Sequence, residues 1–187
     1  MKKYMIYPIL LTIFFITITI YSINRVHLML DEYIVVLIGV IYLILGIYSY
    51  IQQPYTKVMK SYLLLMFVAS LAITLSIPSS LNVPVTKEVE VITVSFAPYV
   101  LLLFFQYFPY TKRPKLYYIM SYISLTLSIA TIGCYFLYHY TETVTLNLIS
   151  RYGIIINIAL SVIVSCAILF QHLKYNSAKI RSQITIL

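Results

Sequence analysis

The chain alternates between long apolar stretches and short polar segments that carry nearly all of its charges. Six stretches have about the length, roughly 20 helical residues, that crosses a hydrocarbon core of roughly 30 Å. They cover residues 4–23, 33–51, 61–78, 89–108, 116–139 and 148–171. Membrane β-strands would alternate apolar and polar positions, whereas these stretches are continuous. The pattern therefore predicts an all-α polytopic membrane helix bundle with six transmembrane helices, in a single domain of residues 1–187.

The fourth stretch ends abruptly in the segment LLLFFQYFPYTKRPK, residues 101–115. Pro109 has no N–H and disfavours helical geometry in the residue before it, so a helix should end there. Lys112, Arg113 and Lys115 follow at once. Cations in short loops stay on the cytoplasmic side of a membrane, so this segment indicates which way the fourth helix faces.

The other charges agree with that orientation. With the N-terminus inside, ten of the thirteen Lys and Arg residues fall in cytoplasmic segments, and all five Asp and Glu residues fall outside. The inner cations are Lys2, Lys3, Lys57, Lys60, Lys112, Arg113, Lys115, Lys174, Lys179 and Arg181. We therefore predict both termini inside (N-in/C-in) and a multi-pass protein of the cell membrane. The net charge of +8 then reflects orientation and contact with anionic membrane lipid, with no nucleic acid as partner.

Composition also indicates that lipid is the solvent. The chain is 61% hydrophobic and 10% charged, whereas soluble domains are about 25% charged. It has 20 tyrosines and no tryptophan, and many tyrosines, including Tyr48, Tyr50, Tyr117 and Tyr152, lie near predicted helix ends, where an amphipathic ring suits the headgroup layer. The basic N-terminus before the first stretch resembles a secretion signal, but the stretch is long and no small-residue cleavage site follows, so we interpret it as a retained helix.

The sequence contains no pattern of catalytic residues. It has no glycine-rich phosphate loop, no paired histidines at zinc spacing and no nucleophilic serine motif. We therefore expect neither an enzyme nor a bound metal or cofactor. Cys134 and Cys166 would differ in membrane depth by roughly 20 Å, beyond the ~7 Å limit for a disulfide. We predict two free thiols that pack as small residues.

Small and polar residues recur at helical spacing inside the stretches. They are Gly39 and Gly46, Ser70 and Thr74, Ser121, Ser124, Ser128 and Thr131, and Asn157, Ser161 and Ser165. Such stripes let helices approach closely and form hydrogen bonds across the contact, which is the favoured interpretation. A polar-lined ligand cavity is the alternative. Asn157 is the most costly of these groups to leave unpaired in lipid, so it must meet a partner or a water.

Two segments resemble the membrane sensor regions of bacterial histidine kinases. Residues 103–109, LFFQYFP, with Lys112, Arg113 and Pro114 behind them, are similar to the exit of a sensor helix in those proteins. Residues 174–184, KYNSAKIRSQI, are similar to a segment that leads into a further helix. The order and spacing of the third to sixth stretches, and FAPYVLLLFFQYF at residues 96–108 in particular, resemble the competence quorum-sensing kinases of the ComP type.

This resemblance, over roughly residues 33–187, implies a membrane region that senses a secreted, lipid-modified peptide pheromone and signals to a cytoplasmic kinase domain. The partners it implies are that extracellular peptide, membrane lipid, and a second copy or a kinase-bearing chain. The sequence departs from the pattern, because its first outer loop is too short for an extracytoplasmic domain and no phosphoacceptor histidine motif or ATP-binding module follows. We expect residues 172–187 to be a cytoplasmic tail or the start of a truncated seventh helix.

An extracellular ligand would first meet the outer carboxylates. The candidate ligand-binding residues are Asp31, Glu32, Glu88, Glu90 and Glu142, with Asn157 inside a helix. The alternative interpretation of the acids is that they are solvated loop charges that follow the topology. The expected function is the signal-input module of a two-component sensor histidine kinase that lacks its kinase domain. The alternatives are a small polytopic transporter subunit, which the absence of a buried charge disfavours, and a bacteriocin-immunity-type membrane protein.

Overall fold

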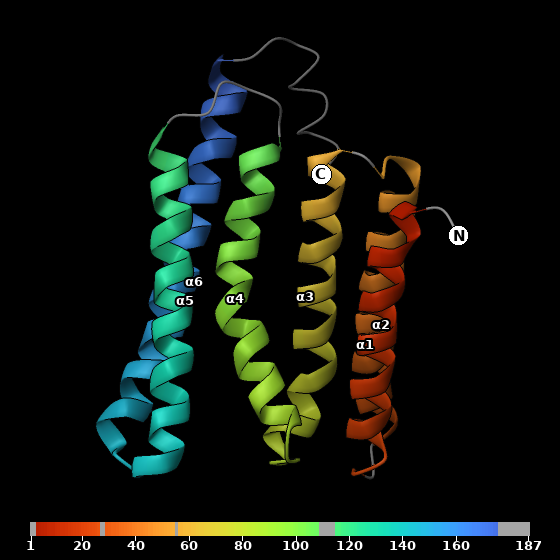
Figure 1. Ribbon diagram of the computed structural model, residues 1–187, viewed down its shortest axis with the longest axis vertical. Helices are drawn as coiled ribbons and strands as arrows, with labels where there is room; N and C mark the ends of the chain where they lie inside the picture. Colours follow the sequence, from red (N-terminus) through yellow and green to blue (C-terminus); the bar gives the residue numbers. More distant parts are fainter. Residues whose placement is uncertain (1–2, 27–28, 55, 109–114, 176–187) are drawn as a thin grey trace. The chain divides into compact units, whose positions relative to one another are not determined.

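The computed structural model of the chain describes residues 3–26, 29–54, 56–108 and 115–175. Across these residues the fold consists of a short 3₁₀ turn, η1 (Lys3–Met5), and long α-helices, with no strand among them (Figure 1). The helices are α1 (Ile6–Ile23), α2 (Leu30–Gln52), α3 (Lys57–Ser80), α4 (Thr86–Tyr107), α5 (Lys115–Thr141) and α6 (Val144–Tyr175). Six helices are long and apolar enough to cross a membrane, which confirms the predicted all-α, six-helix architecture.

Most helices extend beyond the apolar stretches that predicted them. α3 has 24 residues and begins at Lys57 rather than residue 61, and α6 has 32 residues and continues to Tyr175. A helix ends where its terminal backbone groups find other partners, not where the hydrocarbon core ends. At the start of α3, for example, the Thr56 hydroxyl accepts a hydrogen bond from the Met59 N–H at 3.3 Å. Apolar length therefore locates a helix better than it locates its ends.

Several predictions fall outside the described residues. Pro109, Lys112 and Arg113 are among them, and so are residues 176–187. The sharp exit after the fourth helix and the interpretation of the tail therefore stay predictions.

The chain divides into two compact units, Met1–Val94 and Ser95–Leu187, and the boundary falls inside α4. Unit 1 holds α1, α2, α3 and the first residues of α4. Unit 2 holds the remainder of α4 with α5 and α6. α4 is therefore the one described helix that belongs to both units.

In unit 1, α2 packs against α3 through two glycines. A Cβ added at Gly39 would overlap the Thr74 hydroxyl and lie 3.0 Å from the Ser70 carbonyl oxygen. One added at Gly46 would lie 2.8 Å from the Met66 Cβ. Ser70 is fully buried and donates a hydrogen bond to the Gly39 carbonyl oxygen at 2.7 Å. The small-residue stripes of these two helices thus face each other, in line with the expectation that such stripes let helices approach closely.

Two tyrosines near helix ends are buried rather than exposed to the headgroup layer. Tyr50 is 2% exposed, and its hydroxyl donates a hydrogen bond to the Tyr4 carbonyl oxygen at 3.1 Å. The Tyr117 hydroxyl donates to the Gln171 side chain of α6. These hydroxyls join the ends of neighbouring helices, whereas Tyr48 and Tyr152 are exposed, as an interfacial position requires.

Candidate functional site

Two acidic candidates of unit 1 lie at the start of α4. Glu88 is in the first turn of the helix, and Glu90 follows two residues later. The Ser79 side chain, near the end of α3, forms a hydrogen bond with the Glu90 carboxylate, and Lys87 interacts with the same carboxylate electrostatically. The Oε2 atom of Glu88 is buried and has no hydrogen-bond partner among the described residues. We call Ser79, Lys87, Glu88 and Glu90 the α4 entry cluster.

The turn between α3 and α4, residues 81–85, positions this cluster. α3 ends in a Schellman motif, in which the Val83 N–H donates to the Pro78 carbonyl oxygen at 3.1 Å and the Asn82 N–H donates to the Ser79 carbonyl oxygen at 2.9 Å. Asn82 has a φ of 57°, which asparagine tolerates better than most residues. Its side-chain oxygen accepts a hydrogen bond from Lys87 Nζ at 3.0 Å. The end of α3 is thereby tied to the first turn of α4.

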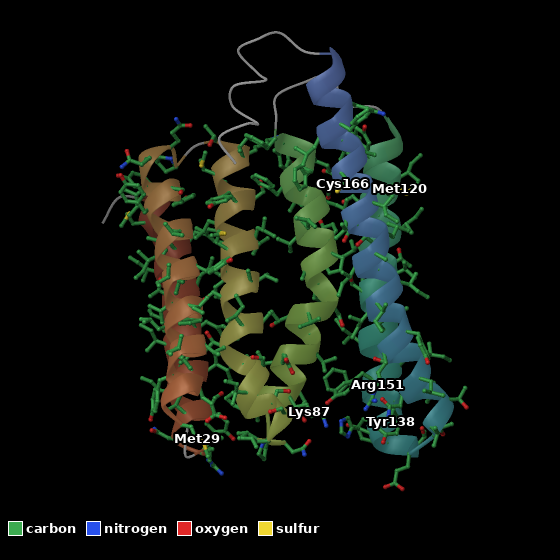
Figure 2. The ribbon with its side chains drawn as sticks, turned by 180° about the vertical axis from the view of Figure 1, so that it is seen from behind. Met29, Lys87, Met120, Tyr138, Arg151 and Cys166 are labelled. Atoms are coloured by element: carbon green, nitrogen blue, oxygen red, sulfur yellow. The ribbon has the colours of Figure 1, made fainter. Side chains whose placement is uncertain are left out.

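A buried hydrogen bond joins α1 to the first residue of α4. The hydroxyl oxygens of Ser22 and Thr86 are 2.9 Å apart, and the two side chains are 1% and 0% exposed. Because Ser22 donates its proton to the Ile18 carbonyl oxygen at 2.7 Å, Thr86 is the donor to Ser22. Met29, just before α2, and Lys87 lie at the same end of unit 1 (Figure 2).

The other acidic candidates have different surroundings. Glu32 accepts a hydrogen bond from the Met29 N–H at 2.6 Å, which caps the start of α2. Asp31 lies in the first turn of α2, and its side chain is outside the described residues. Glu142 belongs to unit 2, where it is exposed in the turn between α5 and α6 with a φ of 53°. Glu88 and Glu90 are therefore the candidates that lie together at the start of α4, and the contacts with Ser79 and Lys87 are those of Glu90.

The last candidate, Asn157, lies in the interior of unit 2 and is 1% exposed. Its Oδ1 accepts a hydrogen bond from Ser124 Oγ at 2.8 Å. Its Nδ2 donates to the Ser124 carbonyl oxygen and to Ser128 Oγ, both at 3.1 Å. Ser128 Oγ also lies 2.6 Å from the Ser95 carbonyl oxygen of α4. The prediction that Asn157 meets a partner is confirmed, and these bonds support helix packing; a ligand role for Asn157 stays a prediction.

Sequence reasoning missed the Ser22–Thr86 pair and the contact of Ser79 with Glu90. Ser22 and Thr86 are 64 residues apart in the chain, and no motif or helical stripe connects them. The one available signal was that Ser22 and Ser79 are small polar residues near the ends of apolar stretches. That signal shows which side chains need partners but not which partners they find.

Both cysteines carry free thiols, as the difference in depth predicts. Cys166 lies near Met120, towards the end of unit 2 opposite to Tyr138 and Arg151 (Figure 2). Cys166 is exposed on α6, whereas Cys134 is half-buried. The expectation that both thiols act as packing groups is therefore wrong for Cys166.

Residues 101–108 end in an aromatic cluster. The ring of Phe104 meets that of Phe105 edge-on at a centroid distance of 5.2 Å and stacks on that of Phe108 at 5.4 Å. Gln106 between them is buried. The segment is thus an ordered end of α4, at the opposite end of that helix from Glu88 and Glu90.

Among the described residues, no group of His, Cys, Asp and Glu side chains has an arrangement that would hold a metal ion. Comparison of the chain with protein-family models, with curated proteins and with solved structures finds no match. Over its described residues the protein is thus all-helical, with six helices long and apolar enough to span a membrane and with the α4 entry cluster at the start of α4.

Proposed function

We propose that the chain is a signal-input module of the cell membrane, on which an extracellular ligand acts at the α4 entry cluster. The observation that carries the proposal is the buried Oε2 of Glu88, which has no hydrogen-bond partner among the described residues. Leaving a buried carboxylate oxygen unpaired is costly, and a cationic group of a ligand would remove that cost. The charge pattern favours an outer location for this cluster.

α4 is the element that would carry the signal. Its first residues belong to unit 1 and the rest to unit 2, so it links the acidic cluster covalently to the aromatic cluster of Phe104, Phe105 and Phe108. Pro98 inside α4 cannot donate a hydrogen bond to the carbonyl four residues earlier, which weakens the helix locally. A ligand that binds one state of α4 more tightly shifts its population towards that state. The resemblance to kinase sensor regions supports a second copy or a kinase-bearing chain as the receiver.

The proposed ligand is a lipid-modified peptide with at least one positive charge. Its amine would pair with the Glu88 carboxylate, whose Oε2 is buried and has no hydrogen-bond partner among the described residues, and its lipid chain would enter the surrounding bilayer. Each buried CH₂ of a lipid chain contributes about 0.8 kcal/mol to membrane binding. The bilayer would therefore concentrate the ligand, and the carboxylate would select it.

The test is a titration of the chain in nanodiscs with a synthetic farnesylated peptide that contains one lysine. Saturable binding above the level of empty nanodiscs is expected. Glu88→Gln with Glu90→Gln should weaken it about 10- to 100-fold, the range for hydrogen bonds to charged groups. Glu142→Gln, an exposed carboxylate of unit 2, is the control and should leave binding unchanged. Equal binding by all variants, or binding no stronger than to empty nanodiscs, would contradict the proposal.

A further inference from the structure

The turn that leads into α4 contains a strained residue. Val85 has a φ of 67°, in the left-handed region, where a β-branched residue is an outlier. Its carbonyl oxygen accepts the hydrogen bond of the Val89 N–H at 3.0 Å, so Val85 occupies the position just before the helix. That position normally has extended backbone geometry and a side-chain oxygen that caps the first turn. Valine here provides neither of them.

Constraints on both sides of Val85 explain its geometry. On one side, the Schellman motif fixes Asn82 and Val83 at the end of α3. On the other, Thr86 is fully buried and bonded to Ser22. Pro84 lies between them with its φ locked near −65°, and it also restricts the residue before it. Val85 is therefore the residue at which the chain completes its change of direction into α4.

We propose that this turn is a strained latch that the Ser22–Thr86 hydrogen bond holds closed. When that bond breaks, Val85 returns to the extended region and the first turn of α4 unwinds. Lys87 and Glu88 then move away from their present positions. The existence of the latch does not depend on the proposed function. Its role does, because in that role a ligand at the α4 entry cluster changes the state of the latch.

The two opposing effects are of comparable size. The Ser22–Thr86 hydrogen bond should favour the closed turn about 2- to 10-fold. The sparsely populated backbone geometry of Val85 should favour the open turn about 5- to 150-fold. The closed latch is therefore sustained by the surrounding contacts together, and the loss of one of them is expected to be measurable.

Hydrogen exchange of the full chain in nanodiscs, without ligand, tests the latch. Thr86→Val keeps the shape of the side chain but removes its donor, so the amides of Val89 and Glu90 should exchange about 2- to 10-fold faster. Val85→Gly removes the strain, so the same amides should exchange at least about 2-fold more slowly, even after the added flexibility of glycine. The double variant should return close to the wild-type rate.

The matched control is Val144→Gly, at the start of α6, where the backbone φ is not positive. Glycine there should speed exchange of the first turn of α6 about 2- to 5-fold, because nothing offsets its flexibility. Unchanged exchange in the interior of α5 shows that each variant is folded. If Thr86→Val does not fold, Ser22→Ala removes the same bond from the side of α1.

Faster exchange in Val85→Gly, as in the control, would overturn the latch. Because these rates are measured without ligand, they do not depend on the proposed function. If they follow the expected order while the farnesylated peptide fails to bind, the latch stands and the proposed function fails. If the peptide binds while Val85→Gly speeds exchange, the proposed function stands and the latch fails.

Discussion

The α2–α3 pair of unit 1 and the α5–α6 pair of unit 2 achieve close packing by different means. In the first pair, the backbones approach where Gly39 and Gly46 have no side chain, and Ser70 donates a hydrogen bond to the Gly39 carbonyl oxygen across the contact. In the second, Asn157 forms hydrogen bonds to Ser124 and Ser128 across the contact. α5 and α6 also approach closely where Gly153 has no side chain, since an added Cβ would overlap Thr131 Cγ2. The α5–α6 contact thus combines a glycine contact with the hydrogen bonds of Asn157, whereas the α2–α3 contact relies mainly on its two glycines.

The difference matters because helices in lipid gain no hydrophobic free energy from association. Close van der Waals contact and interhelical hydrogen bonds provide the stability instead. Glycine contacts fail abruptly when a side chain is added, since tightly packed atoms must move apart. Polar contacts fail more gently, since each lost bond costs about 0.6 kcal/mol on average in a membrane protein. The two pairs should therefore respond to mutation by different amounts.

The largest effect is expected at Gly39. Gly39→Ala should lower the free energy of unfolding by about 2–3 kcal/mol, because its Cβ would overlap Thr74 and press on the Ser70 carbonyl. Gly133→Ala is the matched control, since a Cβ there meets nothing within 4 Å, and it should raise stability by about 0.5–1 kcal/mol. Unfolding in mixed detergent and SDS micelles measures both. Equal changes in the two variants would show that the glycine contact is unimportant.

The next largest effect is expected at Asn157. Asn157→Leu removes three hydrogen bonds and should cost about 1–2 kcal/mol in the same unfolding measurement. Ser161→Ala is the control, because its hydroxyl donates a hydrogen bond to the Ile158 carbonyl oxygen of its own helix, and it should change stability by less than about 0.5 kcal/mol. A stabilised Asn157→Leu variant would indicate that the amide is kept for a ligand rather than for packing.

A smaller pair of substitutions compares the two contacts directly. Ser70→Ala removes a bond that the neighbouring glycine contact supports, and we expect a loss of about 0.5 kcal/mol. Ser124→Ala leaves Asn157 Oδ1 without its described donor, so the loss should be about 1 kcal/mol or more. If Ser70→Ala were the more damaging change, the hydrogen bond rather than the steric fit would dominate the α2–α3 contact.

The smallest effect is expected at Cys166. Its side chain is exposed on α6, so Cys166→Ala should change the unfolding free energy by less than about 0.5 kcal/mol. Cys134→Ala, at a half-buried position, should cost somewhat more. A larger loss of unfolding free energy in Cys166→Ala than in Cys134→Ala would mean that α6 packs through the face that carries Cys166.

The helical architecture was readable from the sequence because continuous apolar stretches of membrane-spanning length have few other structures available to them. The helix ends could not be predicted from the sequence, since caps such as Thr56 lie outside the apolar pattern. The stripe that contains Asn157 indicated that its amide meets a partner or a water, and the structure provides partners on α5. Periodicity within one helix thus predicts which face is packed.

The α4 entry cluster was only partly predictable. Glu88 and Glu90 were candidates because of their charge, but the contacts of Glu90 with Ser79 and Lys87 depend on how the turn after α3 folds. The strain at Val85 and the bond between Ser22 and Thr86 arise from constraints that meet only in three dimensions. A single sequence contains no periodic signal for such contacts between distant segments.

The central claim is that the α4 entry cluster faces outward while the start of α3 faces the cytoplasm. α3 separates Lys57 from the turn before Lys87 by 24 residues, about 36 Å at 1.5 Å per residue. In a background with Cys134→Ala and Cys166→Ala, intact cells carrying Lys87→Cys or Lys57→Cys are treated with a membrane-impermeant maleimide. The account predicts that Lys87→Cys is labelled in intact cells and Lys57→Cys only after permeabilisation, and the reverse pattern would contradict it.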